Sequence, residues 1–171
     1  EATKTYLSRA ETDDERDVIV STSLTLHALL TLAGGGVLVG IALFAPLSEA
    51  AVDSLLVVIV ALTGEQAFKF GRAVLHAHRH EASVEPLILV RSVLLAVVGI
   101  ALAAGTLQVV GVFVGFGVGF MVAGIGASWQ AFRRQPISLL SNIEWAWADR
   151  LLRFGAPSMA LMLLITGLYK A

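Results

Sequence analysis

Long apolar stretches without charged residues alternate with short polar segments along most of this chain. Four of these stretches can each cross a membrane as one helix, because the hydrocarbon core is about 30 Å thick and a helix rises 1.5 Å per residue. A fifth covers only about 18 Å by itself, which predicts a thin or tilted span, with a half-span as the alternative. We therefore predict an all-α, integral membrane helical bundle with about five transmembrane helices, over residues 24–44, 52–75, 86–104, 107–127 and 156–169.

The segment before the first span is acidic. Residues 1–17 contain six carboxylates and three basic side chains. Within them, Thr12 and Glu15 fit the S/T-x-x-E capping box, which predicts a helix that starts here and runs directly into the first span. We expect residues 1–17 to form a solvated cytoplasmic tail or a short surface helix, and residues 18–171 to form a single transmembrane domain.

A second segment outside the spans, residues 137–153, has an amphipathic pattern. Apolar side chains recur at helical spacing, and polar side chains occupy the other faces. Its tryptophans are residues that favour the headgroup boundary. This pattern predicts an amphipathic helix in the cytoplasmic membrane interface. The apolar positions are Leu140, Ile143, Trp147 and Leu151.

Basic residues are distributed asymmetrically around the predicted spans. Eleven of the twelve Lys and Arg residues fall on one side of the membrane, and Lys170 falls on the other. Because Lys and Arg near span ends stay in the cytoplasm, we predict a multi-pass protein of the cytoplasmic membrane with a cytoplasmic N-terminus. The predominance of Arg over Lys in an Ala-, Val-, Leu- and Gly-rich background is typical of a prokaryotic genome.

The composition excludes several classes of function. The chain is 57% hydrophobic and 15% charged, whereas soluble proteins average about 25% charged residues. It has no cysteine, which excludes disulfides, thiolate metal sites and thiol redox chemistry. The net charge of −1 and the clustering of basic residues at span ends argue against a nucleic-acid partner. We expect no enzymatic activity and no cofactor. The expected partners are the lipid bilayer and either copies of this chain or a larger membrane complex.

One carboxylate is predicted to lie within the hydrocarbon region. Glu65 is about thirteen residues past the start of the second span, near 20 Å along the helix axis. Intramembrane carboxylates usually face a bundle interior, a partner charge or a water-filled path. Lys69, Arg72, His76 and Arg79 follow on the same side of the helix. The series predicts an ion or proton path, or alternatively a Glu65–Lys69 ion pair followed by the solvated face of an emerging helix.

Three further ionisable side chains, together with His76, are candidates for smaller roles. Arg91, about one turn into the third span, is predicted to snorkel to the cytoplasmic surface or to pair with Glu65. His76 and His80 are the candidate metal ligands, and they also suit a pH sensor, with polar filler as the alternative. His27 is expected to hydrogen-bond near the cytoplasmic edge of the first span, with haem or chlorophyll ligation as the alternative.

Glycines predict where helices pack. Gly111, Gly115 and Gly119 form a small-x-x-x-small ridge through the fourth span, and Gly36 and Gly40 form a shorter one in the first. Such ridges let helix backbones approach closely where no hydrophobic effect drives association. The pattern leaves open whether the partner helix belongs to the same chain, to a symmetry mate or to another protein.

Two short segments recur along the chain. Residues 40–43 are repeated at 99–102, and residues 66–69 are closely matched at 130–133. A duplication would give two helical hairpins related in parallel, as in several transporter architectures. Chance matching of residues common in membrane sequences is the alternative.

Two functional hypotheses follow, with a sensor built on the histidine cluster as a lesser third. The first is an oligomeric channel or transporter whose path passes Glu65. The second is a non-catalytic accessory subunit that packs against a larger complex through the glycine-rich fourth span. We favour the first, because an intramembrane ionisable residue is by default a functional-site hypothesis.

Overall fold

The computed structural model describes residues 2–78, 80–105, 108–134 and 143–153, and no strand occurs among them. The all-α prediction is therefore confirmed. Four of the described helices are long and apolar enough to cross a membrane. The predicted fifth span, residues 156–169, lies outside the described residues. The four long helices are α2 (Asp13–Phe44), α3 (Glu49–Ala77), α4 (Glu85–Ala104) and α5 (Gln108–Arg134).

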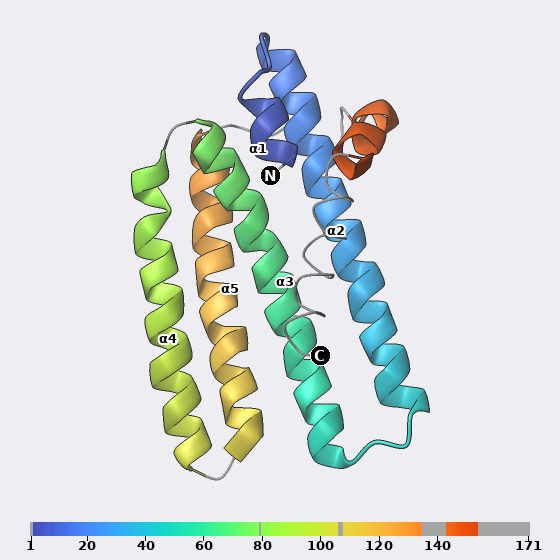
Figure 1. Ribbon diagram of the computed structural model, residues 1–171, viewed down its shortest axis with the longest axis vertical. Helices are drawn as coiled ribbons and strands as arrows, with labels where there is room; N and C mark the ends of the chain where they lie inside the picture. The colour runs from blue at the N-terminus through green and yellow to red at the C-terminus, as the bar shows by residue number, and fades with distance from the viewer. Residues whose placement is uncertain (1, 79, 106–107, 135–142, 154–171) are drawn as a thin grey trace, which may run out of the picture.

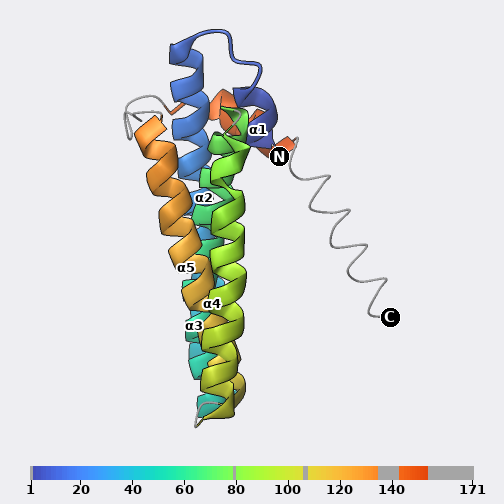
Figure 2. The same ribbon diagram turned by 90° about the vertical axis from the view of Figure 1, so that its left-hand side faces the viewer.

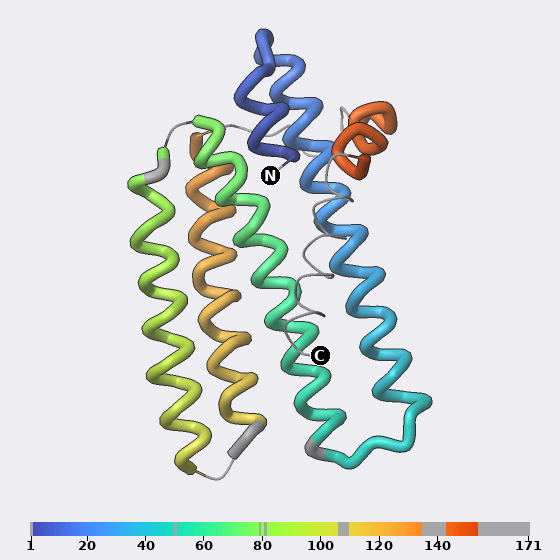
Figure 3. The backbone as a smooth tube through the Cα atoms, in the orientation of Figure 1, coloured from blue at the N-terminus to red at the C-terminus, as the bar shows by residue number. Residues whose placement is uncertain are grey.

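These helices stand side by side in one layer, in the order α4, α5, α3, α2 (Figure 1). Seen edge-on, the layer is thin (Figure 2). The helices form two hairpins, α2–α3 and α4–α5, which meet through α3 and α5, and these two helices run in the same direction (Figure 3). The described helices thus enclose no lumen, and they leave both faces of the layer uncovered along most of its length.

The surface of the layer is apolar along much of its length. Leu32, Leu43 and Phe44 of α2 are 71%, 72% and 88% exposed, and Ile100 of α4 is 69% exposed. Soluble monomers rarely expose apolar patches of this extent, whereas lipid chains match such a surface. The chain is therefore a membrane protein. Its most covered span is α5, which lies between α3 and α4.

Local sequence sets the helix boundaries. The Thr12 hydroxyl oxygen accepts a hydrogen bond from the Glu15 N–H at 3.2 Å, so α2 begins where the capping box predicts and continues without a break into the first span. Ser48 caps α3 in the same way. In α4, Pro86 occupies the first turn, where its missing N–H costs no helical hydrogen bond.

A short N-terminal helix, α1 (Ala2–Leu7), folds back against α2 and α3 at one end of the layer. Leu7 is only 3% exposed and belongs to an apolar cluster with residues of α2 and α3. The buried hydroxyl groups of Thr3 and Ser23 are 2.7 Å apart, within hydrogen-bond distance. The acidic segment therefore contains a short helix that is fixed to the layer by burial.

Residues 145–153 form a further helix beside α2 (Figure 1). Leu151 is buried, and Trp147 meets Tyr6 of α1 edge-on, with ring centroids 5.5 Å apart. This helix covers the second half of the predicted amphipathic helix 137–153, whose first residues lie outside the described part. It joins α1 and α2 in a single packed end of the layer.

The Lys and Arg residues gather at the same end of the layer. α2 and α4 begin there, and α3 and α5 end there (Figure 1). Of the twelve Lys and Arg residues, Arg79 and Lys170 are not described. The other ten all lie toward this end. Each is either in the nearer half of one of the four long helices or in α1, the α1–α2 connection or the helix 145–153. They are Lys4, Arg9, Arg16, Lys69, Arg72, Arg91, Arg133, Arg134, Arg150 and Arg153.

Candidate functional site

The contact between α3 and α5 fixes which side of α3 stays open. A Cβ atom added to Gly64 would lie 2.6 Å from the backbone nitrogen of Met121, and one added to Gly71 would lie 2.5 Å from the carbonyl carbon of Ala127. A Cβ atom on Gly124 would collide with the carbonyl oxygen of Gly64. Only glycine permits backbones to approach this closely, so these residues set the rotation of α3 about its axis.

The side of α3 that neither α5 nor α2 covers carries Glu65, Lys69, Arg72 and His76, which we call the charged face. Lys69 Nζ donates to Glu65 Oε1 at 2.8 Å, and the two side chains are 53% and 36% exposed. Further along the helix, Arg72 Nε donates to His76 Nε2 at 3.2 Å. The structure thus places four of the predicted site residues together, on a surface that no described helix covers. Arg79, the next residue of the predicted series, lies outside the described residues.

Glu65 lies deep within the layer. It is about 18 Å from one end of α3 and about 24 Å from the other. The fifth predicted site residue, Arg91, lies at nearly the same depth, and α5 provides the comparison. A Cβ atom on Gly119 would lie 2.8 Å from the carbonyl oxygen of Arg91. Gly64, the neighbour of Glu65, contacts the next two residues of α5, Phe120 and Met121. The 20 residues of α4 span about 30 Å, which places Arg91 about 9 Å inside the membrane.

Two aromatic rings hold the guanidinium of Arg91. Its Cζ atom is 5.3 Å from the centre of the Phe68 ring on α3 and 5.0 Å from that of the Phe120 ring on α5. Cation–π attraction of this kind is stronger away from water. The Arg91 side chain thus links α4 to its neighbour α5 and reaches past it to α3. The sequence offered snorkelling or a pair with Glu65, but the carboxylate pairs with Lys69 instead.

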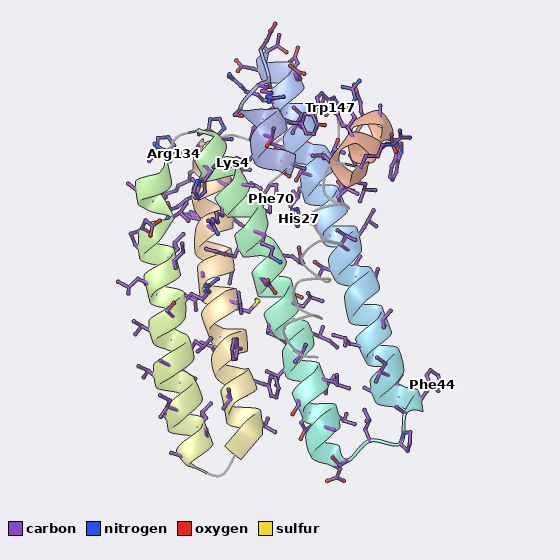
Figure 4. The ribbon with its side chains drawn as sticks, viewed as in Figure 1. Lys4, His27, Phe44, Phe70, Arg134 and Trp147 are labelled. Carbon is purple, nitrogen blue, oxygen red and sulfur yellow. The ribbon has the colours of Figure 1, made fainter. Side chains whose placement is uncertain are left out.

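A second polar contact joins α2 to α3 at this depth. His27 Nδ1 lies 2.9 Å from Gln66 Oε1, and the imidazole meets the Phe70 ring edge-on at 6.2 Å between centroids (Figure 4). The sequence predicted a hydrogen bond for His27 near the cytoplasmic edge, but its partner is on the neighbouring helix. Gln66 was not predicted as a site residue, and the signal that could have identified it is an amide side chain within the second span, next to Glu65.

The histidines at the end of α3 face guanidinium groups. His76 Nε2 accepts from Arg72, and His80 Nε2 lies 3.4 Å from Arg134 Nη1. Among the described residues, no three His, Asp or Glu side chains come together as a metal-binding group. A metal ion at either of these imidazole nitrogens would have to displace a neighbouring cation, so the two candidate metal ligands stand in unfavourable surroundings for one.

The predicted ridge on α5 faces α4 of the same chain. A Cβ atom on Gly115 would lie 2.5 Å from the Cα atom of Gly99, and one on Gly111 would lie 2.6 Å from the carbonyl carbon of Leu102. Gly119 meets the backbone of α4 in the same way. The ridge therefore serves packing within the α4–α5 hairpin, which answers the question of its partner.

The other predicted glycine pair has no such contact. Cβ atoms on Gly36 and Gly40 of α2 would meet nothing within 4 Å in the described structure. Three glycines that the sequence analysis did not single out, Gly64, Gly71 and Gly99, make close backbone contacts instead. Each is separated from the next glycine along the chain by more than four residues, although Gly71 and Gly99 form small-x-x-x-small pairs with Ala67 and Ala103.

An apolar groove of about 360 Å³ lies on a different side of the α3–α5 pair. Two of its three α3 residues, Thr63 and Ala67, are two positions from Glu65 and therefore about 200° around the helix, and Gly64 lies about 100° from Glu65. No ionisable side chain lines it. The lining residues are Thr63, Gly64, Ala67, Met121, Ile125, Ser128, Trp129 and Phe132.

Comparison with known proteins gives no match. No protein-family model fits the chain, and no curated protein or solved structure matches it. Its function therefore has to be inferred from the chemistry of the charged face and its surroundings.

Proposed function

We propose that this chain is a subunit of a homo-oligomeric channel or transporter, with the charged face of α3 lining a path between copies. One observation carries the proposal. The Glu65–Lys69 ion pair lies at membrane depth, yet its side chains are 36% and 53% exposed on a surface that no described helix covers. Ionisable side chains are costly in lipid and usually face a water-filled cavity or a partner.

Several copies are needed because a single layer of helices cannot surround water. In a cyclic assembly, the same face of every copy turns toward a common axis or a neighbour. The charged faces would then border a shared path, and the apolar surfaces would remain in lipid. We place the protein in the cytoplasmic membrane, with the end that carries the Lys and Arg residues on the cytoplasmic side, because Lys and Arg near span ends are retained there.

The accessory-subunit alternative assigned the ridge of Gly111, Gly115 and Gly119 to a partner protein. Since α4 of the same chain contacts that ridge, such a partner would have to use another surface. Native mass spectrometry after mild extraction separates the two hypotheses. A symmetric homo-oligomer supports a shared path, whereas extraction in a fixed ratio with a larger, different protein would favour the accessory role.

Flux through reconstituted protein tests the path directly. Liposomes that contain the wild-type protein should release entrapped salt faster than protein-free liposomes. Glu65→Gln leaves the Lys69 ammonium unpaired in the path, where it repels a cation or retains an anion. We therefore expect this variant to slow release roughly tenfold, the order of effect of one partly solvated charge.

The matched control is Thr63→Val, two residues away on the groove side of α3. It removes a hydroxyl group of the same helix at nearly the same depth and should leave the flux unchanged. Size-exclusion chromatography and circular dichroism confirm that both variants fold. Equal release by wild-type protein and Glu65→Gln would rule out a path along the charged face.

A further inference from the structure

Arg91 places a positive charge at the depth of Glu65, and Arg72 of the charged face places a second one about 10 Å nearer the end of α3. Lys69 neutralises Glu65, the one carboxylate of the face, at 2.8 Å. The described contacts of Arg72 and Arg91 are with the His76 ring and with two aromatic rings. Two positive charges therefore have no carboxylate partner within the described part of the chain.

The rings hold Arg91 in place but do not neutralise it. A benzene ring attracts a cation through its quadrupole and contributes no net charge. The planar guanidinium presents five N–H donors in a rigid fork, a geometry suited to oxyanions and other anions. Arg91 is thus a fixed positive charge, with an apolar backing of Phe68 and Phe120, beside the open face of α3.

Other copies of the chain cannot supply a negative charge at the depth of Arg91. Apart from Glu65, every carboxylate of the four long helices lies within the first five residues of its helix. Symmetric copies in a membrane place each Glu65 at the same depth, where Lys69 already pairs with it. Two net-positive faces also repel each other in direct contact. The carboxylates at helix starts are Asp13, Asp14, Glu15, Asp17, Glu49, Asp53 and Glu85.

We infer that the shared path takes small inorganic anions, with Arg91 and Arg72 as the residues that attract them. This inference rests on the proposed function, because selectivity requires a path. Mobile anions between the copies would supply the missing counter-charge. Lys or Arg side chains around a pore favour anions in the same way.

Reversal potentials under a KCl gradient measure this selectivity. The wild-type protein should give a potential of the sign set by chloride. Arg91→Gln should lower the permeability ratio of chloride to potassium about tenfold, and Arg91→Lys, which keeps the charge, should retain the chloride sign. Arg72→Gln should lower the ratio as well, and its exposed position makes it the variant least able to disturb packing.

Arg133→Gln is the matched control. Arg133 also lies over an aromatic ring, 5.0 Å from the centre of Trp129, but at the end of α5 instead of the depth of Glu65. The variant removes the same charge and the same kind of contact, and it should leave the permeability ratio unchanged.

The outcomes separate this inference from the proposed function. A wild-type potential of the potassium sign, or equal losses in Arg91→Gln and Arg133→Gln, would overturn anion selectivity and leave the path intact. Flux no greater than that of protein-free liposomes would overturn both. Native mass spectrometry adds one arm: an anionic lipid retained by wild-type protein but lost from Arg91→Gln, without chloride selectivity, would assign the site to a lipid phosphate and overturn the inference.

Discussion

His27 of α2 and Gln66 of α3 lie within hydrogen-bond distance, with 2.9 Å between Nδ1 and Oε1. Among the long helices, α2 contacts only α3, so this bond and the adjacent ring contact with Phe70 help to determine where α2 stands. Glu65, the residue before Gln66, points to the charged face. Successive residues of α3 thus serve two purposes, one holding the hairpin together and one facing the proposed path.

Replacing Gln66 by Leu should destabilise the α2–α3 hairpin by about 1 kcal/mol, because it leaves a half-buried imidazole without its partner. His27→Leu should cost a similar amount. The double replacement should cost less than the sum, since two apolar side chains can pack where two polar ones were bonded. A double-mutant cycle of unfolding free energies in detergent measures the coupling, and strictly additive effects would show that the bond contributes nothing.

Gly115→Leu should prevent the α4–α5 hairpin from closing and cost about 3 kcal/mol or more, because even a Cβ atom at this position would lie 2.5 Å from the Cα atom of Gly99. Gly36→Leu is the matched control, since the space beside Gly36 is open and its effect should stay within about 0.5 kcal/mol. Thermal unfolding of the two variants checks the difference. A stable Gly115→Leu monomer that had lost only its oligomeric state would place the partner of Gly115 in another chain.

Glu65→Gln should lower the free energy of unfolding by only about 0.5 kcal/mol, the usual value for an exposed pair four residues apart on a helix. Lys69→Gln should have a similarly small effect. Chemical denaturation in detergent gives both values. A loss of several kcal/mol in either variant would indicate a structural ion pair, and a loss of flux in Glu65→Gln would then reflect unfolding.

Leu7→Ala should detach α1 from the layer and cost about 2–3 kcal/mol, because Leu7 is buried in the cluster that α1 shares with α2 and α3. The neighbouring exposed residue provides the control, and Ser8→Ala should be nearly neutral. Limited proteolysis reports the change, since a detached α1 would be cleaved in Leu7→Ala and protected in Ser8→Ala. Equal protection in both would show that the buried contact does not hold the helix.

The sequence was sufficient to predict four spans and which residues share the charged face, because both depend on short-range patterns. Apolar length predicts a span, and the spacing of Glu65, Lys69, Arg72 and His76 along one helix determines that they share a side. The capping box at Thr12 is equally local. Each of these features can be read from one helix without knowledge of its neighbours.

Contacts between helices could not be predicted in this way, because they depend on rotation and register. Gln66 can be identified as the partner of His27 only when the position of α3 beside α2 is known. The Arg91 guanidinium was expected near the membrane surface or beside Glu65. The register between α4 and α5 instead places it over the rings of Phe68 and Phe120. The single-layer arrangement was also not predicted, since nothing in a hydropathy pattern specifies which helices touch.

Water beside the charged face is the central claim, and cysteine labelling tests it most directly. The chain has no native cysteine, so a single introduced thiol reports one position. Ala61 lies four residues before Glu65 on the same side of α3, whereas Ala67 lines the apolar groove. In reconstituted membranes, Ala61→Cys should react with a membrane-impermeant thiol reagent at least about tenfold faster than Ala67→Cys, because the reactive thiolate forms only in water. Equal rates, or faster labelling at Ala67→Cys, would contradict the account.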